Sequence, residues 1–139
     1  MRFMVIVPGN EQSEANVMPD TSLFEAMGRF NEELVNAGVL VAAEGLAPTS
    51  KGVRIEFANG TTRVVDGPFT ETKELIAGFW LIEVKSKEEA IEWFRRAPFG
   101  GGMHLEIRQV AEADDLGPEF TPELQEAEAR LRERIATNQ

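Results

Sequence analysis

Four short apolar runs along the chain predict the strands of one sheet. They cover residues 3–7, 39–43, 77–84 and 104–110. The first and third runs are apolar at successive positions, which is typical of strands with cover on both sides. We therefore expect a sheet with both faces covered and with residues 3–7 as a central strand.

A hairpin separates the second run from the third. Residues 53–57 alternate between apolar and polar side chains, Asn59-Gly60 follows, and residues 61–65 continue after the turn. Asn-Gly between two such segments is a strong hairpin signal, because both residues tolerate positive φ.

Two segments carry apolar residues at helical spacing. The first begins with a capping box at residues 22–25, in which Ser22 and Glu25 each accept an amide N–H, and it ends at Gly38. Its apolar stripe consists of Leu23, Met27, Phe30 and Leu34. The second segment begins with a capping box at residues 86–89 and ends before Pro98.

The end of the chain differs in composition from the rest. A polar linker leads to Thr121-Pro122, a capping hydroxyl followed by a proline that suits the first helical position. We expect residues 1–111 to form the main domain and residues 112–139 to form a linker and an amphipathic helix. Such a short helix is unstable alone, so we expect it to pack on its own domain or across a dimer.

The order of elements predicts an α+β fold with a ferredoxin-like βαβ–hairpin–βαβ plan. In this plan an antiparallel sheet carries both main helices on one face and leaves the other face bare. A second copy of the sheet is the most economical cover for the bare face. We therefore expect a homodimer formed through the open sheet face.

Composition excludes several classes of function. The chain has 139 residues, no cysteine, one histidine and a formal net charge of −10. The missing cysteines exclude disulfides, thiolate nucleophiles and Cys-ligated metal sites, and one histidine is too few for a His-rich metal site. The negative charge disfavours binding to nucleic acid phosphates. No apolar run reaches the roughly 18 residues of a membrane span, and the N-terminal run is too short for a signal peptide. We expect a soluble, cytoplasmic protein that uses no metal or cofactor.

One nine-residue segment resembles a known family signature. Residues 66–74 read Asp-Gly-Pro-Phe-Thr-Glu-Thr-Lys-Glu and are similar to the signature of the DGPF branch of the YCII-related family. Residues 44–46, 78–82 and 106–110 agree with the same resemblance, which covers about residues 1–111.

The resemblance implies a ferredoxin-like fold of the dimeric α+β barrel group. Members of this group dimerise through the sheet and leave a cleft near the barrel mouth. Most have no assigned activity, and a few relatives act on small aromatic metabolites, including removal of chloride from a chlorinated hydroxyquinol. Many DGPF proteins are thought to be encoded beside alternative sigma factors. Some YCII-type members carry a histidine on the first helix, proposed to form an acid/base dyad with a carboxylate, but residues 27–31 here contain none.

Three residues are the catalytic candidates. Asp66 lies in a rigid Gly-Pro turn and is the candidate general base or ligand carboxylate, because partial desolvation raises an Asp pKa toward neutrality. His104 has the only type of side chain whose unperturbed pKa lies near neutrality, and alternation predicts that it shares a strand face with Glu106 and Arg108. Glu71 is a candidate proton acceptor. The structural alternatives are a turn that only fixes the sheet, a structural histidine and a solvated charge run.

Four further residues are candidates for substrate binding: Phe69, Lys73, Glu44 and Arg108. Lys73 would neutralise an anionic group of the substrate. Glu44 closes an apolar strand, where a carboxylate is usually exposed or paired with a cation. The arginines that could pair with Glu44 instead are Arg54, Arg63 and Arg108.

These candidates support three hypotheses of function. The first is an enzyme that moves a proton on a small aromatic or carbonyl-bearing molecule in a dimer cleft, as an isomerase, lyase or dehydrohalogenase. The second is a non-catalytic dimer that binds a small ligand or a regulatory protein, with a possible link to sigma-factor-dependent transcription. The third is a purely structural dimer whose polar loop only fixes the sheet.

Overall fold

The computed structural model describes residues 1–138, with the backbone alone at residue 72. It contains two compact units, residues 1–109 and residues 110 onward. The predicted boundary at residues 111/112 stays a prediction. In the described part of the chain, no helix is long and apolar enough to cross a membrane.

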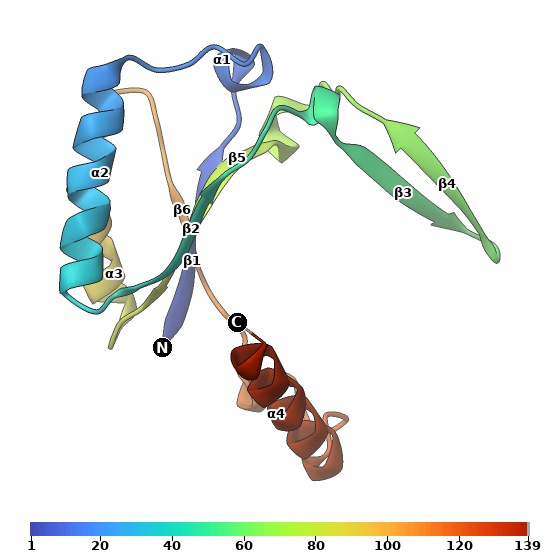
Figure 1. The fold of residues 1–139 in the computed structure, drawn as a ribbon. Coiled ribbons are helices and arrows are strands. Elements are labelled where there is room, and N and C mark those ends of the chain that lie inside the picture. Colours follow the sequence, from blue (N-terminus) through green and yellow to red (C-terminus); the bar gives the residue numbers. More distant parts are fainter. Residues whose placement is uncertain (139) are drawn as a thin grey trace. The chain divides into compact units, whose positions relative to one another are not determined.

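The first unit is built on a four-stranded sheet with the order β2-β5-β1-β6, in which all neighbouring strands are antiparallel. Helices α2 (Thr21–Asn36) and α3 (Lys87–Phe94) lie on the same side of this sheet (Figure 1). The strands are β1 (Arg2–Pro8), β2 (Leu40–Gly45), β5 (Ile76–Glu83) and β6 (Glu106–Gln109). This order and connectivity confirm the predicted ferredoxin-like α+β fold.

The core lies between the two helices and one face of the sheet. Alternate residues of the central strands are buried there, including Phe3 and Val5 on β1 and Ile82 on β5, each at most 1% exposed. Trp80 of β5 packs edge-on against Phe30 of α2 and Phe94 of α3, with ring centroids 6.1 and 5.1 Å away. Edge-to-face pairs of this kind stabilise a core beyond the burial of their area.

The opposite face of the sheet is also apolar, and neither α2 nor α3 of the first unit lies over it (Figure 1). Met4 and Ile6 of β1 and Phe79 and Leu81 of β5 point to this face and are half-buried. We call these four residues the open sheet face. Exposed Arg108 and Glu106 of β6 pair with Met4 and Ile6, so these charges border it.

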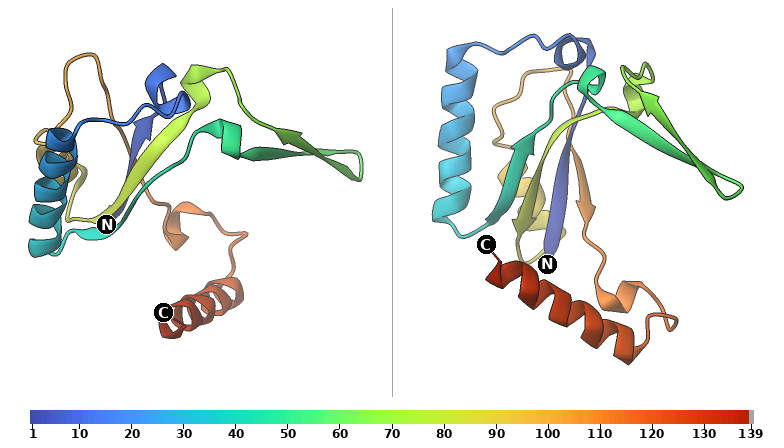
Figure 2. Two further views of the ribbon diagram at one scale, coloured as in Figure 1. Left: turned by 45° about the horizontal axis from the view of Figure 1, so that its top comes forward. Right: turned by 45° about the vertical axis from the view of Figure 1, so that its right-hand side comes forward.

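A two-stranded hairpin extends from the first unit on the side away from the helices (Figures 1 and 2). It consists of β3 (Val53–Ala58) and β4 (Thr61–Asp66), joined by Asn59 and Gly60 with φ of 43° and 83°. These positive values confirm the predicted Asn-Gly turn. One face of the hairpin is apolar and more than half exposed; its residues are Val53, Ile55, Phe57 and Val64.

Helix α2 begins two residues earlier than predicted, with its N-cap at position 20 instead of 22. Asp20 is the N-cap: its Oδ1 accepts from the Leu23 amide at 3.0 Å and from the Ser22 hydroxyl at 2.7 Å. The capping box at residues 22–25 is therefore wrong, because the carboxylate of Asp20 supplies the acceptor instead. The Ser22 hydroxyl and the Leu23 amide lower the pKa of the Asp20 carboxyl, since both bonds favour its charged form.

The end of α2 follows the prediction. Gly38 has φ of +72°, and the amide of Val39 donates to the Leu34 carbonyl at 2.9 Å. Leu34 and Val39 are both buried, so the hydrophobic contact that accompanies this type of helix end is present.

Three other helix starts test the sequence pattern. Ser86 caps α3 as predicted, and Thr121 and Pro122 begin α4 (Pro122–Thr137) in the second unit. A short helix, α1 (Glu11–Glu14), was not predicted; Asn10 and Ser13 cap each other's backbone at its start. Single 3₁₀ turns occupy Thr49–Lys51, Thr72–Glu74 and Ala113–Asp115.

Two glycines of the α2 region should respond oppositely to alanine. Gly28 lies inside α2, where an added Cβ would meet nothing within 4 Å, whereas Gly38 has positive φ. We expect Gly28→Ala to raise the free energy of unfolding by about 0.5–1 kcal/mol, because alanine loses less entropy in a helix. Gly38→Ala should lower it by about 1 kcal/mol through backbone strain. Urea denaturation of both variants and the unaltered chain measures these changes; equal signs would contradict the assignment.

Candidate functional site

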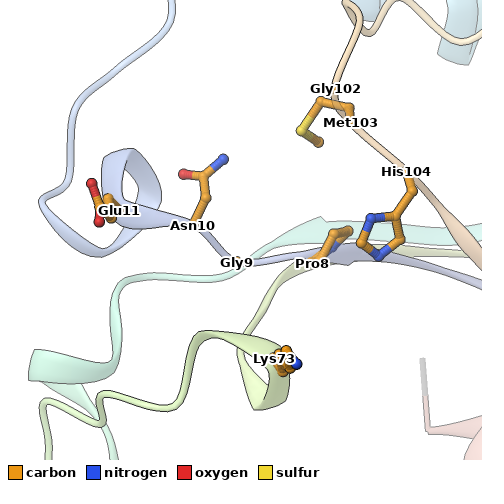
Figure 3. A pocket seen from close by; sticks show the side chains of 8 residues that line it. All are labelled: Pro8, Gly9, Asn10, Glu11, Lys73, Gly102, Met103 and His104. Carbon is orange, nitrogen blue, oxygen red and sulfur yellow. The ribbon is translucent and has the colours of Figure 1, made fainter.

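A cavity of about 470 Å³ lies at the end of β1 (Figure 3). Its walls come from the β1–α1 connection, the 3₁₀ turn Thr72–Glu74 and the segment that enters β6. The lining residues are Pro8, Gly9, Asn10, Glu11, Lys73, Gly102, Met103 and His104. This volume falls within the usual range for small-molecule sites, roughly 300–1,000 Å³.

Gly9 brings Lys73 to the end of β1. Its amide donates to the Leu75 carbonyl at 2.8 Å, and a Cβ on Gly9 would lie only 2.8 Å from the Leu75 Cβ. Only glycine therefore permits this approach without a shift of buried Leu75. The contact holds the turn that carries Lys73 against the strand end.

His104 reaches the cavity by strand register. Ile6 pairs with Glu106, so the same antiparallel register continued outward places His104 opposite Pro8, as Figure 3 shows. Strand β6 begins at Glu106, and His104 precedes it in an exposed segment after Gly102, whose φ is +86°. The prediction that the last strand begins at His104 is therefore wrong, because the β1 pairing ends at Glu106.

The cavity contains one imidazole and one ammonium group from different segments. His104 and Lys73 are both exposed; in Figure 3 the His104 ring is drawn next to Pro8, and Lys73 stands apart on the 3₁₀ turn. The Asn10 Oδ1 accepts from the Ser13 amide at 2.9 Å, so this side chain acts as a helix cap. Within the described residues, no group of three or more His, Asp or Glu side chains could hold a metal ion. A cavity lined by an ammonium and an imidazole suits binding of an anionic group near a proton-transfer site.

The predicted signature turn is a packed structural feature. A Cβ on Gly67 would lie 1.8 Å from the Thr49 carbonyl oxygen, so this position accepts no side chain. The Phe69 amide donates to the Thr49 hydroxyl at 2.9 Å, and the Arg54 guanidinium lies 3.9 Å from the Phe69 ring centroid. Arg54 also approaches Glu74 at 3.7 Å. The turn is thus held to the segment before β3 by backbone contact and a hydrogen bond with Thr49, and to β3 by the Arg54 contact with the Phe69 ring.

Glu14 of α1 extends this arrangement. Its carboxylate accepts from the Thr49 amide at 2.9 Å and from the Thr49 hydroxyl. Thr49 therefore connects α1 to the signature turn, since its hydroxyl donates to Glu14 and accepts from Phe69. Because α1 and the signature turn also flank the cavity walls, this connection positions Glu11 and Lys73.

The other predicted catalytic residues lie elsewhere. Asp66 is exposed at the end of β4, opposite Val53, and Glu71 is exposed in the following loop. Neither lines the cavity that contains His104 and Lys73. Their catalytic roles stay predictions.

The remaining candidates for substrate binding occupy three different places. Phe69 lines a separate cavity of about 400 Å³ with Arg54 and Glu74. Arg108 is exposed and lies 3.9 Å from Glu106 on the border of the open sheet face. Glu44 is exposed on β2 opposite Phe79. The arginines considered as its partners approach other carboxylates: Arg54 with Glu74, Arg63 with Glu56, and Arg108 with Glu106.

Sequence reasoning missed Glu14, Thr49 and Gly9, which build the site. Glu14 and Thr49 are 35 positions apart, and Thr49 and Phe69 are 20 apart. No local pattern connects residues at such separations. A glycine directly after an apolar strand was the one available signal, since it often marks a close approach of backbones.

Comparison with known proteins now assigns the family. The family model described as the YCII-related domain matches residues 1–114. An uncharacterized protein of Rhizobium meliloti is 35% identical over 86 residues, which cover 62% of this chain and 64% of that protein. The chain therefore belongs to the YCII-related family and aligns with somewhat less than two thirds of that relative's length. The narrower assignment to the DGPF branch stays a prediction based on residues 66–74.

Two substitutions at Thr49 should separate the hydroxyl from the rest of the side chain. Thr49→Val removes the partner of the Phe69 amide and one donor to Glu14, so we expect a loss of about 1–3 kcal/mol in the free energy of unfolding. Thr49→Ser keeps the hydroxyl and should cost less than about 1 kcal/mol. Urea denaturation compares the two, and equal losses would mean that the hydroxyl does not hold the turn.

Proposed function

We propose that this YCII-related protein is a cofactor-independent enzyme that moves a proton on a small, carbonyl-bearing anionic molecule. His104 is the acid/base group and Lys73 binds the anionic oxygen. The observation that carries the proposal is the cavity of about 470 Å³, whose walls include both the only histidine of the chain and a lysine.

The chemistry follows from the two side chains. The His104 imidazole takes a proton from the carbon next to the carbonyl, and the C–H electron pair moves onto the carbonyl oxygen to form an enolate. The Lys73 ammonium stabilises the negative charge on that oxygen. Return of the proton to another carbon completes an isomerisation, and expulsion of a leaving group by the enolate completes an elimination. The step needs no external oxidant or reductant.

The other candidate residues support this proposal indirectly, through the position of Lys73. Phe69 acts in the packed signature turn, and the same turn continues to Lys73. A turn fixed this rigidly gives a defined position to a long, otherwise mobile side chain. Asp66 and Glu71 do not line this cavity, so the proposed proton transfer assigns them no role.

Substitution of His104 tests the enzyme directly. We expect His104→Gln to lower the rate by about 10²- to 10⁴-fold, because it removes the acid/base group. Lys73→Met should lower kcat as well as kcat/KM, because its ammonium stabilises the negative charge that develops on the enolate oxygen. Lys87→Met, at an exposed position on α3, should change neither parameter. The assay is exchange of carbon-bound hydrogen for deuterium in small carbonyl acids, followed by proton NMR. An unchanged exchange rate in His104→Gln would exclude the proposed role.

We further propose that the working form is a homodimer joined through the open sheet face. The support is the row of half-buried apolar side chains, Met4, Ile6, Phe79 and Leu81, on the face opposite α2 and α3. Pro8 continues the same side of β1 by alternation and lines the cavity. A partner on this face would thus border the cavity and restrict its access to water.

Introduction of a charge on the open sheet face tests the dimer. We expect sedimentation velocity to give twice the chain mass of 15.4 kDa for the unaltered protein. Leu81→Glu should shift the protein to the single-chain mass, because it buries a carboxylate without a partner. Val35→Glu, at an exposed site on α2, should leave the mass unchanged. A monomer before any substitution would contradict the proposal.

A non-catalytic binding role is the second candidate, favoured by the surface of α4. Leu124, Leu131 and Ile135 of this helix are 51%, 54% and 60% exposed. A stripe of this kind suits the groove of a partner protein. This role would be favoured over catalysis if the full-length protein binds a partner protein and does not catalyse exchange of carbon-bound hydrogen in the small carbonyl acids.

A further inference from the structure

A third cavity, of about 410 Å³, lies between the first half of α2 and the sheet. Its walls are mainly apolar and include Met18, Leu23, Phe24, Met27, Trp80 and Phe99. It shares no lining residue with the cavity of about 470 Å³ that contains both His104 and Lys73, although a smaller cavity of about 310 Å³ is lined by both His104 and Phe99. The aromatic cavity and the site proposed for proton transfer therefore have different walls.

The cavity exists because α2 packs closely only over its second half. Phe30 and Leu34 are at most 5% exposed, whereas Leu23 and Met27 of the same apolar stripe are only half-buried. Phe24 and Met18 at the rim are 56% and 62% exposed. Large apolar side chains around a hollow, left accessible to water, mark a ligand site more often than a packing defect.

One polar group inside the cavity has unused hydrogen-bonding capacity. The Trp80 indole N–H donates to Asn31 Oδ1 at 2.8 Å. An indole nitrogen is a donor only, so this bond fixes the Asn31 amide with its oxygen toward Trp80. Its NH₂ group donates to no group in the described part of the chain, and Asn31 lines the cavity. It can therefore donate to a ligand.

The floor of the cavity is aromatic and rigid. Trp80 contacts Phe30, Phe94 and Phe99, with ring centroids 5.1–6.1 Å away. Glu44 lines the cavity, but its strand position opposite Phe79, next to Ala43, directs its side chain to the other face of the sheet. The interior thus has an aromatic surface, one amide donor and no inward carboxylate.

We propose that this cavity binds a small neutral aromatic molecule with one hydrogen-bond acceptor, such as a carbonyl oxygen. The ring packs against Trp80, Met27 and Phe99, and the acceptor receives a hydrogen bond from the Asn31 amide. The inference goes beyond the proposed proton transfer, because neither His104 nor Lys73 takes part.

Two probes of matched shape test the site by ¹H–¹⁵N NMR of the full-length protein. Acetophenone has the aromatic ring and the carbonyl, and ethylbenzene lacks the acceptor. We expect acetophenone to shift the Trp80 indole and Asn31 amide signals saturably and to leave the Trp93 indole unmoved. Ethylbenzene should bind about tenfold more weakly, which is the effect of one neutral hydrogen bond.

Variants separate the cavity from non-specific binding. Asn31→Asp keeps an acceptor for the Trp80 indole but removes the amide donor, so acetophenone should lose its about tenfold advantage over ethylbenzene. Met27→Trp fills the cavity and should abolish the Trp80 shift. Phe24→Asp, at the exposed rim, provides the same test if Met27→Trp does not fold.

Three outcomes would overturn the proposal. They are no saturable shift at Trp80, a shift that persists in both Met27→Trp and Phe24→Asp, or Trp80 signals that move with protein concentration but not with probe. The last would mean that a second copy fills the cavity. His104→Gln should leave the acetophenone shifts unchanged, so failure of the enzyme proposal and failure of this one are distinguishable.

Discussion

Packing of both helices on one side of the sheet is the constraint on which the other features of the first unit depend. Phe3, Val5 and Ile82 are buried because α2 and α3 cover that side, and the aromatic cluster around Trp80 forms there. The other side keeps apolar residues that neither α2 nor α3 covers. Burial of such a face is worth roughly 25 cal/mol for each Å² removed from water, which favours a cover over it.

The packed signature turn changes how the nine-residue segment is understood. Its most distinctive residues fit a backbone approach at Gly67 and a ring contact at Phe69, which are structural demands. The side chain of this segment that can bind a substrate is Lys73, near its end, which lines the cavity with His104. In this arrangement the rigid residues hold the turn, and the turn positions one cation at a strand end.

The sequence predicted the elements of the fold well because these depend on local patterns. Strand alternation, the Asn59-Gly60 turn, the Gly38 helix end and the Ser86 and Thr121 caps all involve residues within a few positions of each other. Competition between neighbouring caps was harder to predict: Asp20 and Ser22 both suit an N-cap, and the carboxylate took that place.

The candidate sites were less predictable because they depend on contacts between distant segments. Lys73 and His104 line the same cavity only because of the Gly9 contact with Leu75 and the register of β1 with β6. The aromatic cavity was equally hidden, since the stripe from Leu23 to Leu34 is uniform in sequence, although only its second half is buried. Periodicity shows which face of a helix is apolar but not how closely that face approaches a sheet.

The β3–β4 hairpin affects how readily molecules of this protein aggregate through their strands. Its unpaired edges and exposed Phe57, 81% accessible, could add to the strands of neighbouring molecules and start a fibril. Along β3, however, Arg54 and Glu56 alternate with the apolar residues, and Arg63 of β4 pairs with Glu56 at 2.7 Å. Stacking of identical strands would bring like charges together at each layer, which opposes growth of an ordered aggregate. The same alternation that makes the hairpin therefore also keeps the protein dispersed.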